Sequence, residues 1–386
     1  MRRLAFAILG LFLAAQGQAQ SIVPAPPQVA AEAFILVDAA TGFVIASEKP
    51  DAALPPASLT KLMTSYVLAN EIAEGRLSRD EQVVVSENSW SQNPVFNGSS
   101  LMWIEPGKDV TIGELERGIV IASGNDATVA VAEHIAGSEE AFAELMNQHA
   151  ERLGLSNSHF MNSHGLPDPN HYTTARDLAK LSAAIIREFP EHYARYKELD
   201  YTYNDIKQYN RNKLLREDPS VDGLKTGYTS EAGYGLVASA KRGDMRLISV
   251  VLGTSSPTAR KNETRSLLNY GFRFYETARL LDAGEELEKP RVWKGQVDYA
   301  PVGVLDEIVL TLPRGKRQQV EQRVALVDDI EAPLAVGDSV GTLTLLLDGE
   351  LLYQGPVVAL EAVAPGGFFA RLWDIILMWL ASLFGG

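Results

Sequence analysis

The feature that most restricts the fold is a long helical region flanked on both sides by paired β-rich runs. Residues 33–38 and 43–47 form the first pair, and the turn between them carries Gly42. Residues 234–240 and 245–252 form the second pair around a polar turn. Both pairs are typical of β-hairpins. Strands from both ends of the region can join in one antiparallel sheet, with the helices packed on it. The sequence therefore predicts an α+β fold.

Apolar residues recur elsewhere in this region with the 3.6-residue period of an amphipathic helix. The ranges with this period are 60–73, 112–122, 126–136, 139–153, 178–189 and 260–278. A capping-box pattern from Thr174 to Asp177 precedes the fifth of them. Strand character is also present at 201–203. We assign residues 29–281 to one domain.

The pattern changes after residue 281 to short alternating runs separated by Gly, Pro and Asp. The runs are 307–312, 323–327, 341–347, 350–354 and 357–360. They predict a second, all-β domain over residues 282–365. This part contains no histidine, so a spacer or docking module is the simplest interpretation.

The N-terminus predicts export. Arg2 and Arg3 are followed by an apolar run, residues 4–15, and by small residues before Ala19. This is the pattern of a signal peptide, residues 1–19, cleaved after Ala19, and the run is shorter than the roughly 20 residues of a membrane span. The chain has no cysteine, which excludes disulfides and thiol chemistry. Its net charge of −14 argues against nucleic acid as a partner.

The C-terminal segment, 366–386, predicts an amphipathic helix. After two glycines, residues 368–384 carry only two charges, Arg371 and Asp374. A helix of about 25 Å is short of a hydrocarbon core about 30 Å thick. One narrow side holds Arg371, Asp374, Met378, Ala381 and Ser382, while Phe, Trp, Leu and Ile fill the rest. We expect a helix that lies in the membrane surface. Docking on the protein's own core and steeply tilted insertion are the alternatives.

Ser58 is a candidate nucleophile. Two prolines and Ala57 precede it, and a helix-compatible apolar run follows, so a helix is predicted to begin at or just before Ser58. Lys61 then lies one turn along on the same face. An unprotonated lysine could take the hydroxyl proton, and free N–H groups of the first turn could stabilise an oxyanion. Alone, the pattern also fits a serine N-cap with a surface lysine.

Two further stretches carry matching chemistry. Ser123 and Asn125 flank Gly124 between two helical patterns, where a tight turn could place hydroxyl and amide side by side. Lys225 and Thr226 lead through Gly227 into the second hairpin, where an edge strand could bind a substrate backbone and its carboxylate. Each stretch alone is more often a plain turn or strand end.

Together, the three stretches resemble the penicilloyl serine transferases, which are the penicillin-binding proteins and serine β-lactamases. The likeness is closer to the D-alanyl-D-alanine carboxypeptidases, the low-molecular-mass penicillin-binding proteins. Its other carriers are Pro56-Ala-Ser-Leu-Thr-Lys-Leu-Met-Thr-Ser-Tyr66, Asn93-Pro-Val-Phe-x-Gly-Ser-Ser-Leu-Met102, His164-Gly-Leu166 and Ala175-Arg-Asp177. The β domain and the amphipathic tail are also similar. The resemblance implies a β-lactamase/transpeptidase-like fold for residues 29–281.

The resemblance implies a role for each catalytic candidate. Ser58 attacks the carbonyl between the last two D-alanines of a peptidoglycan stem peptide, and Lys61 is its base. Ser123 passes a proton to the leaving D-alanine, and Asn125 positions Lys61 and the substrate. Backbone N–H groups of Ser58 and Tyr228 form the oxyanion hole. Water then releases the tetrapeptide, β-lactams trap Ser58, and no cofactor or metal is needed.

The resemblance also implies which residues bind the substrate's terminal carboxylate. Lys225 and Thr226 face the terminal carboxylate of the substrate. Arg260 matches a family arginine near that carboxylate, and Arg211 resembles another, although its spacing to Lys225 is one residue shorter. Tyr228 stands where close relatives can carry histidine, so its backbone role is carried over but a side-chain role in deacylation is not. The family setting is the periplasmic face of the bacterial inner membrane, in peptidoglycan maturation and remodelling.

Four alternatives remain open. A D,D-endopeptidase acting on cross-links would use the same chemistry. A class A β-lactamase would need a deacylating glutamate, which residues 159–166 lack. A zinc peptidase could use His159, His164, Asp168 and His171, but their spacing is irregular. A non-catalytic peptidoglycan-binding module is disfavoured because Ser58, Lys61, Ser123 and Lys225 are all present.

Overall fold

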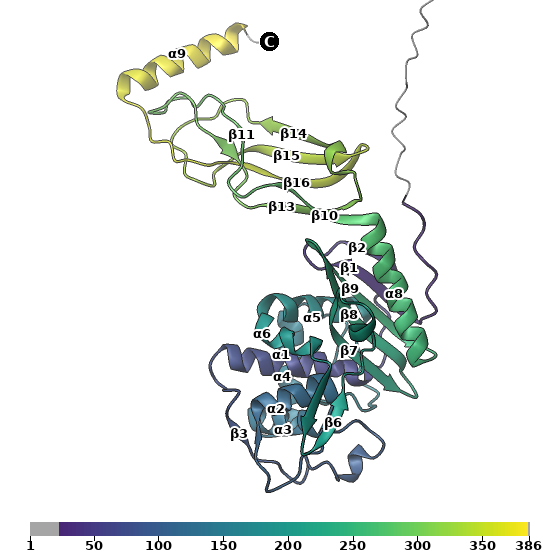
Figure 1. The fold of residues 1–386 in the computed structure, drawn as a ribbon. Coiled ribbons are helices and arrows are strands. Elements are labelled where there is room, and N and C mark those ends of the chain that lie inside the picture. Colours follow the sequence, from purple (N-terminus) through teal and green to yellow (C-terminus); the bar gives the residue numbers. More distant parts are fainter. Residues whose placement is uncertain (1–22, 385–386) are drawn as a thin grey trace, which may run out of the picture.

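The computed structural model describes residues 23–384, so the predicted signal peptide, residues 1–19, lies outside the described residues. An antiparallel five-stranded sheet forms the centre of the first domain (Figure 1). Its strand order is β2 (Val44–Glu48), β1 (Ala33–Asp38), β9 (Met245–Thr254), β8 (Gly233–Arg242) and β7 (Val221–Thr229). Strands from both ends of the helical region therefore share one sheet, and the predicted α+β fold is confirmed.

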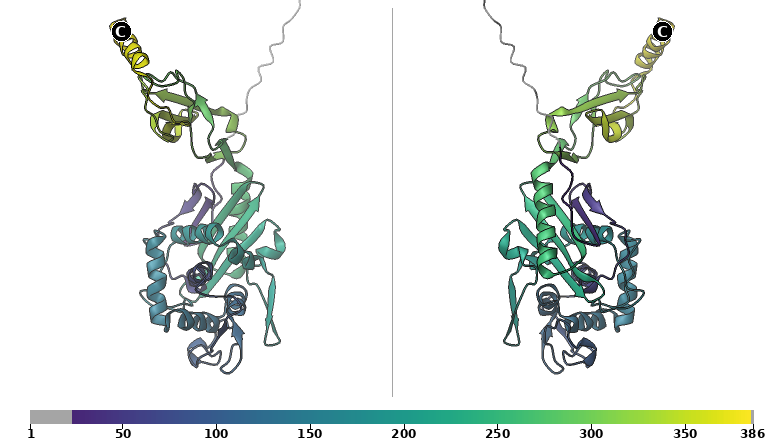
Figure 2. Two further views of the ribbon diagram at one scale, coloured as in Figure 1. Left: turned by 90° about the vertical axis from the view of Figure 1, so that its left-hand side faces the viewer. Right: turned by 90° about the vertical axis from the view of Figure 1, so that its right-hand side faces the viewer.

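Helices cover both faces of this sheet (Figures 1 and 2). The helices of this domain are α1 (Lys61–Ala73), α2 (Ile112–Arg117), α3 (Asn125–Ala136), α4 (Glu139–Arg152), α5 (Ala175–Glu188), α6 (Pro190–Tyr193), α7 (Leu214–Glu217) and α8 (Pro257–Phe274), of which α5 and α8 lie against the strands from opposite faces. Alternate residues of a strand point to opposite faces. Ile35 accordingly packs in the core with residues of α1 and α5, while Phe34 and Leu36 pack in the core with α8.

The predicted helix 260–278 is wrong at its end. Helix α8 stops at Phe274, and the following residues form strand β10 (Tyr275–Leu281), which pairs with β13 (Ile308–Pro313). The run is compatible with either structure, and the pairing with a strand distant in sequence decides between them. Two short ladders complete the first domain: β3 (Gln82–Val83) with β4 (Val110–Thr111), and β5 (Asp200–Tyr203) with β6 (Ile206–Tyr209).

The C-terminal domain is all-β, as predicted. Its larger sheet has the order β11 (Glu286–Glu288), β12 (Val302–Gly303), β16 (Glu350–Ala359), β15 (Ser339–Leu347) and β14 (Val320–Leu326). The predicted runs 350–354 and 357–360 are one strand, β16. Pro356 is tolerated within it because β12 pairs only with Val358 and Ala359, which leaves that edge of Pro356 without a ladder partner.

The chain ends in helix α9 (Phe368–Phe384), at the predicted position. The β domain separates α9 from the first domain, so the three parts follow one another along the molecule (Figures 1 and 2). None of the helices within residues 23–384 is long and apolar enough to cross a membrane.

Candidate active site

Ser58 lies in a tight turn at the head of α1. Residues Ala57–Thr60 form a short 3-10 helix that continues directly into α1. Ala57 has a φ of 49°, in the left-handed region that non-glycine residues rarely adopt. The half-buried Ser58 opens into a cavity of about 290 Å³. The predicted helix start at Ser58 is therefore present, with a strained residue directly before the candidate nucleophile.

Lys61 is buried and makes three hydrogen bonds. In its ammonium form Nζ donates to Asn125 Oδ1 at 2.7 Å, to the His164 carbonyl oxygen at 2.7 Å and to Ser58 Oγ at 3.1 Å. A neutral amine has two N–H groups and one lone pair. Since Asn125 Oδ1 and the His164 carbonyl can only accept, they take both N–H groups and direct the lone pair at Ser58 Oγ. This arrangement suits a base that removes the Ser58 proton.

The surroundings favour the neutral form of Lys61. Burial, followed by the positive charge of Arg211, lowers the pKa of Lys61 to about 7, and the negative charges of Asp126 and Glu139 oppose this shift. A pKa near neutrality leaves a substantial fraction of Lys61 unprotonated at pH 7.

Ser123 and Asn125 project from the turn between a π-helix and α3. The π-helical turn Gly118–Ala122 ends at Ser123, which has left-handed backbone angles of φ 62° and ψ 35°. Such π-turns are often found at functional sites. A Cβ on residue 124 would lie 2.8 Å from the Met102 backbone nitrogen, so only glycine fits at this position of the turn. Both side chains consequently line the cavity beside Ser58.

Lys225 lies on the edge strand β7. Its Nζ donates to Ser123 Oγ at 2.8 Å and to the Thr226 carbonyl oxygen at 3.1 Å. Burial, and then the positive charges of Lys61 and of nearby arginines, lower its pKa well below the usual value. A Cβ on Gly227 would lie 2.9 Å from the Pro56 carbonyl oxygen, so glycine lets β7 approach the nucleophile turn.

Two arginines border the cavity on the α8 side. Arg260 donates to the Gly227 carbonyl oxygen at 2.9 Å and lies 5.5 Å from the Tyr234 ring, which stacks on Tyr228 at 4.1 Å between ring centroids. Arg211 also lines the cavity. Burial lowers the pKa of both guanidinium groups, that of Arg260 to about 10. The concentration of cations suits a substrate carboxylate.

Sequence reasoning missed two supports of the site. The first is Asp126, whose carboxylate accepts hydrogen bonds from the backbone N–H groups of Met102 at 2.8 Å, Trp103 at 2.7 Å and Ile104 at 3.2 Å. This contact holds the loop that contains Ser100 against the cavity. An acidic residue in the first turn of α3 was the available signal, but its partners are distant in sequence.

The second support is the loop that contains His164. Gly165 has a φ of 89°, and a Cβ there would lie 1.8 Å from the Ala57 carbonyl oxygen. His171 Nε2 is 2.8 Å from Thr60 Oγ1, which ties the same loop to the nucleophile turn. A backbone carbonyl as a ligand of Lys61 leaves no signal in the sequence.

The histidines weighed as zinc ligands have other contacts. His159 Nδ1 is 2.8 Å from the Asn170 carbonyl oxygen, and His164 Nε2 is 3.3 Å from Glu139 Oε1. Within residues 23–384, no group of three or more His, Cys, Asp or Glu side chains is placed to hold a metal ion.

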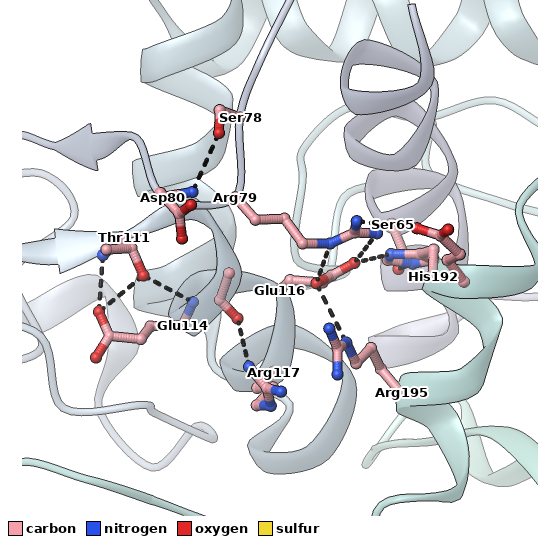
Figure 3. A network of polar contacts seen from close by, with 12 residues as sticks. Ser65, Ser78, Arg79, Asp80, Thr111, Glu114, Glu116, Arg117, His192 and Arg195 are labelled. Carbon is pink, nitrogen blue, oxygen red and sulfur yellow. Dashed lines mark hydrogen bonds and ion pairs between the residues drawn. The ribbon is translucent and has the colours of Figure 1, made fainter. Parts of the chain in front are cut away.

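A buried ionic network surrounds Glu116 and reaches α1 one helical turn past Lys61 (Figure 3). Glu116 accepts from Arg79 Nε at 3.1 Å and is 2.6 Å from His192 Nδ1. His192 Nε2 is 2.5 Å from the hydroxyl of Ser65, one helical turn past Lys61. Burial would raise the pKa of Glu116, but His192 and Arg79 outweigh it and lower the pKa to about 2. The network joins α1 to α2 and α6.

Family models match both domains. The model of the D-alanyl-D-alanine carboxypeptidases matches residues 20–256, and that of the penicillin-binding protein 5 C-terminal domain matches residues 275–365. The chain is 43% identical over 369 residues to D-alanyl-D-alanine carboxypeptidase DacA of Escherichia coli K12, which covers 95% of this chain and 92% of that protein.

Solved structures are also similar to this chain. Penicillin-binding protein 5 from Haemophilus influenzae superposes with a TM-score of 0.83 at 41% identity, over 88% of this chain and 99% of that one. Penicillin-binding protein D2 from Listeria monocytogenes, in its ampicillin-bound form, gives a TM-score of 0.57 at 28% identity over 64% of this chain and 100% of that one.

Proposed function

The chain belongs to the D-alanyl-D-alanine carboxypeptidase family, and we propose how its residues carry out the reaction of that family. The protein is a serine-type hydrolase that removes the terminal D-alanine from peptidoglycan stem peptides through an acyl-enzyme. The observation that supports our assignment most strongly is the hydrogen-bonding geometry of Lys61, which directs a neutral amine at Ser58.

Acylation begins with transfer of the Ser58 hydroxyl proton to the lone pair of Lys61. The Ser58 oxygen then bonds to the carbonyl carbon between the last two D-alanines. The developing oxyanion accepts hydrogen bonds from the backbone N–H groups of Ser58 and Tyr228. Asn125 holds Lys61 in position through its 2.7 Å contact and presents its amide to the substrate.

Collapse of this intermediate breaks the C–N bond and expels D-alanine. Ser123 Oγ accepts a hydrogen bond from Lys225, so its own hydroxyl proton can point at the departing amine. The proton that left Ser58 reaches this amine by way of Lys61 and Ser123. Water then attacks the ester and gives its proton to Lys61, which returns it to Ser58 Oγ as the shortened peptide leaves.

The substrate strand lies along the outer edge of β7, which ends the five-stranded sheet. An extended peptide can add to such an edge through backbone hydrogen bonds. Lys225, Thr226 and Arg260 then face its terminal carboxylate, and Arg211 adds a further cation at the cavity wall. β-Lactams present a carboxylate and a reactive carbonyl in a similar arrangement, so they acylate Ser58.

We also propose that the protein is exported by residues 1–19 and then attaches to the membrane surface through α9. The support for attachment is the exposure of large apolar side chains on α9, including Phe369 at 83% and Trp379 at 62%. A helix with an outward apolar face of this kind suits the interface of a bilayer. The setting is the periplasmic face of the inner membrane.

The predicted domain limits, 29–281, 282–365 and 366–386, remain part of this proposal. The pairing of β10 with β13 favours moving the first boundary to Tyr275. In this division the first domain supplies the whole cavity, and the β domain supplies none of its lining within the described residues.

The test uses a stem pentapeptide and a fluorescent penicillin. The parent protein is expected to release one D-alanine, seen by mass spectrometry, and to become covalently labelled at Ser58. Ser58→Ala removes the attacking oxygen and should abolish both. Labelling that persists in Ser58→Ala would show that another residue is the nucleophile, and cleavage of a cross-linked dimer instead of the pentapeptide would favour an endopeptidase.

A further inference from the structure

Helix α9 leaves the β domain without a free linker. The Gln296 backbone N–H donates to the Ala364 carbonyl oxygen at 2.9 Å, and the Gly366 N–H donates to the Lys294 carbonyl oxygen at 2.8 Å. Pro365 forms an isolated bridge with Gly295. The chain is therefore hydrogen-bonded to the β domain up to two residues before α9 begins.

A second attachment lies inside the helix, at Asp374. Its Oδ1 accepts from Arg291 Nη2 at 2.9 Å, and its Oδ2 accepts from the Lys294 backbone N–H at 2.6 Å. The guanidinium of Arg291 lies 3.9 Å from the centroid of the Trp293 ring, which holds it in place. Asp374 is only 8% exposed. At 1.5 Å per residue, this attachment is about 9 Å beyond the start of α9.

Two attachments fix the direction of the helix axis, and the side chain of Asp374 fixes its rotation. Leu377 and Met378, on the Asp374 side, are partly buried. The outward residues are largely exposed: Phe368 74%, Phe369 83%, Leu372 45%, Trp373 61%, Ile375 49%, Ile376 40%, Trp379 62% and Leu380 38%. The sequence interpretation placed Asp374 on the polar side of a surface helix. That side faces the β domain.

The opposite end of the β domain is also held by a buried aspartate. Asp38, at the end of β1, is fully buried, and its Oδ2 accepts from Thr277 Oγ1 at 2.6 Å and from Thr311 Oγ1 at 2.8 Å. These threonines belong to β10 and β13. Both joints of the molecule are thus closed by a carboxylate that crosses between its parts.

We propose that Asp374 is a latch that fixes α9 to the β domain with its apolar face outward, so that the protein docks on a lipid bilayer in one orientation. The inference rests on the proposed attachment of α9 to membranes. Asp38 keeps the second joint closed, so the orientation extends to the domain that carries Ser58, on the far side of the β domain (Figures 1 and 2).

A bilayer with anionic headgroups is the occupant that this face fits best. Its apolar residues include Trp373 and Trp379, which are suited to the headgroup level. Arg371 lies about 60° around the helix from Asp374, at the border of the apolar face, where a cation can meet lipid phosphates. A second copy of the chain is the competing occupant.

The experiment compares Asp374→Ala with Asp328→Ala, which removes the same charge from an exposed position of the same domain. Amide hydrogen exchange at Lys294 is measured in solution without lipid. Vesicles of phosphatidylethanolamine and phosphatidylglycerol then report binding. Energy transfer from a fluorescent penicillin on Ser58 to an acceptor lipid reports the distribution of heights of the active site above the bilayer.

Asp374→Ala is expected to speed exchange at Lys294 by about tenfold, the factor for loss of one net hydrogen bond, while Asp328→Ala leaves it unchanged. On vesicles, Asp374→Ala should still bind and should broaden the distance distribution, whereas the parent and Asp328→Ala give one narrow distribution. Unchanged exchange and an unchanged distribution in Asp374→Ala would overturn the latch.

Failure of the membrane proposal would look different. If the parent does not bind vesicles, the attachment of α9 is wrong, and a docking role for the latch falls with it, although faster Lys294 exchange would still establish the contact. A second copy as the occupant would appear as concentration-dependent dimers. Dimers that persist both in Asp374→Ala and in the presence of vesicles would assign the apolar face to that copy and contradict bilayer docking.

Discussion

Two buried ionisable groups, Lys61 and Glu116, lie beside positively charged side chains. These side chains have opposite effects on whether each group is charged. Lys61 faces the cavity, and burial and a nearby arginine lower its pKa to about 7. Glu116 lies near the next turn of helix α1, where His192 and Arg79 overcome burial and lower its pKa to about 2. Burial, helped by one arginine, thus favours the neutral form of the lysine, while the positive partners of the glutamate keep it ionised and fixed. The comparison separates the proposed base from a group that stabilises the fold.

The largest expected effect is at Lys61 and concerns the rate of acylation. Lys61→Met keeps the length of the side chain but removes the base, so we expect acylation by a fluorescent penicillin to slow by about 10²–10⁴-fold. The melting temperature should fall only modestly, because no buried charge is left unpaired and only the Asn125 and His164 oxygens lose a donor. The measurement is stopped-flow labelling together with thermal unfolding, with Lys180→Met, on the exposed face of α5, as the control. A large loss of stability in Lys61→Met would show that Lys61 is structural.

The next largest effect is expected at Glu116 and concerns the stability of the fold. Glu116→Gln leaves Arg79 and His192 without their carboxylate, so we expect the free energy of unfolding to fall by about 3 kcal/mol. Folded Glu116→Gln should acylate at nearly the parent rate. Denaturant unfolding and penicillin labelling measure the two quantities. Glu191→Gln is the matched control, because Glu191 contacts the same Arg79 at 3.4 Å but is exposed. Equal destabilisation in both variants would contradict the role given to the buried network.

A smaller effect is expected when the arginine beside each group, Arg211 or Arg79, is removed. Arg211→Gln removes a positive charge that lowers the pKa of Lys61, so the pH midpoint of acylation should rise by a fraction of a unit. Arg79→Gln should raise the pKa of Glu116 without moving the acylation midpoint. The pH dependence of labelling and the NMR titration of Glu116 measure these shifts. A midpoint that moves with Arg79→Gln would mean that the two charges are not independent.

Periodicity predicted most of the fold because apolar faces, caps and hairpin turns are local. Thr174, for example, caps α5 by accepting from the Asp177 N–H, as its pattern indicates. The errors arise where distant pairing decides. Residues Tyr275–Leu281 are a strand because β13 lies beside them, and Pro356 stays within β16 because its edge has no neighbour there.

The site also divides into features with a local sequence signal and features that depend on distant contacts. Ser58, Lys61, Ser123 and Lys225 were found because their side chains carry the chemistry, and the structure brings them to one cavity or into hydrogen-bond contact with it. The His164 carbonyl escaped prediction because any residue supplies a backbone oxygen. The partners of Asp126 escaped it because they are backbone N–H groups of a loop more than 20 residues away in sequence.

The most direct test of the central claim is the pH dependence of Ser58 acylation in the free enzyme. A fluorescent penicillin whose carboxylate stays ionised is used between about pH 5.5 and 9. Because the proposed base is the neutral form of Lys61, the second-order rate constant should rise with pH through a midpoint near Lys61's pKa of about 7 and then level off. A rate that does not change over this range, or that is still rising at its upper end towards the ordinary lysine pKa, would contradict the account.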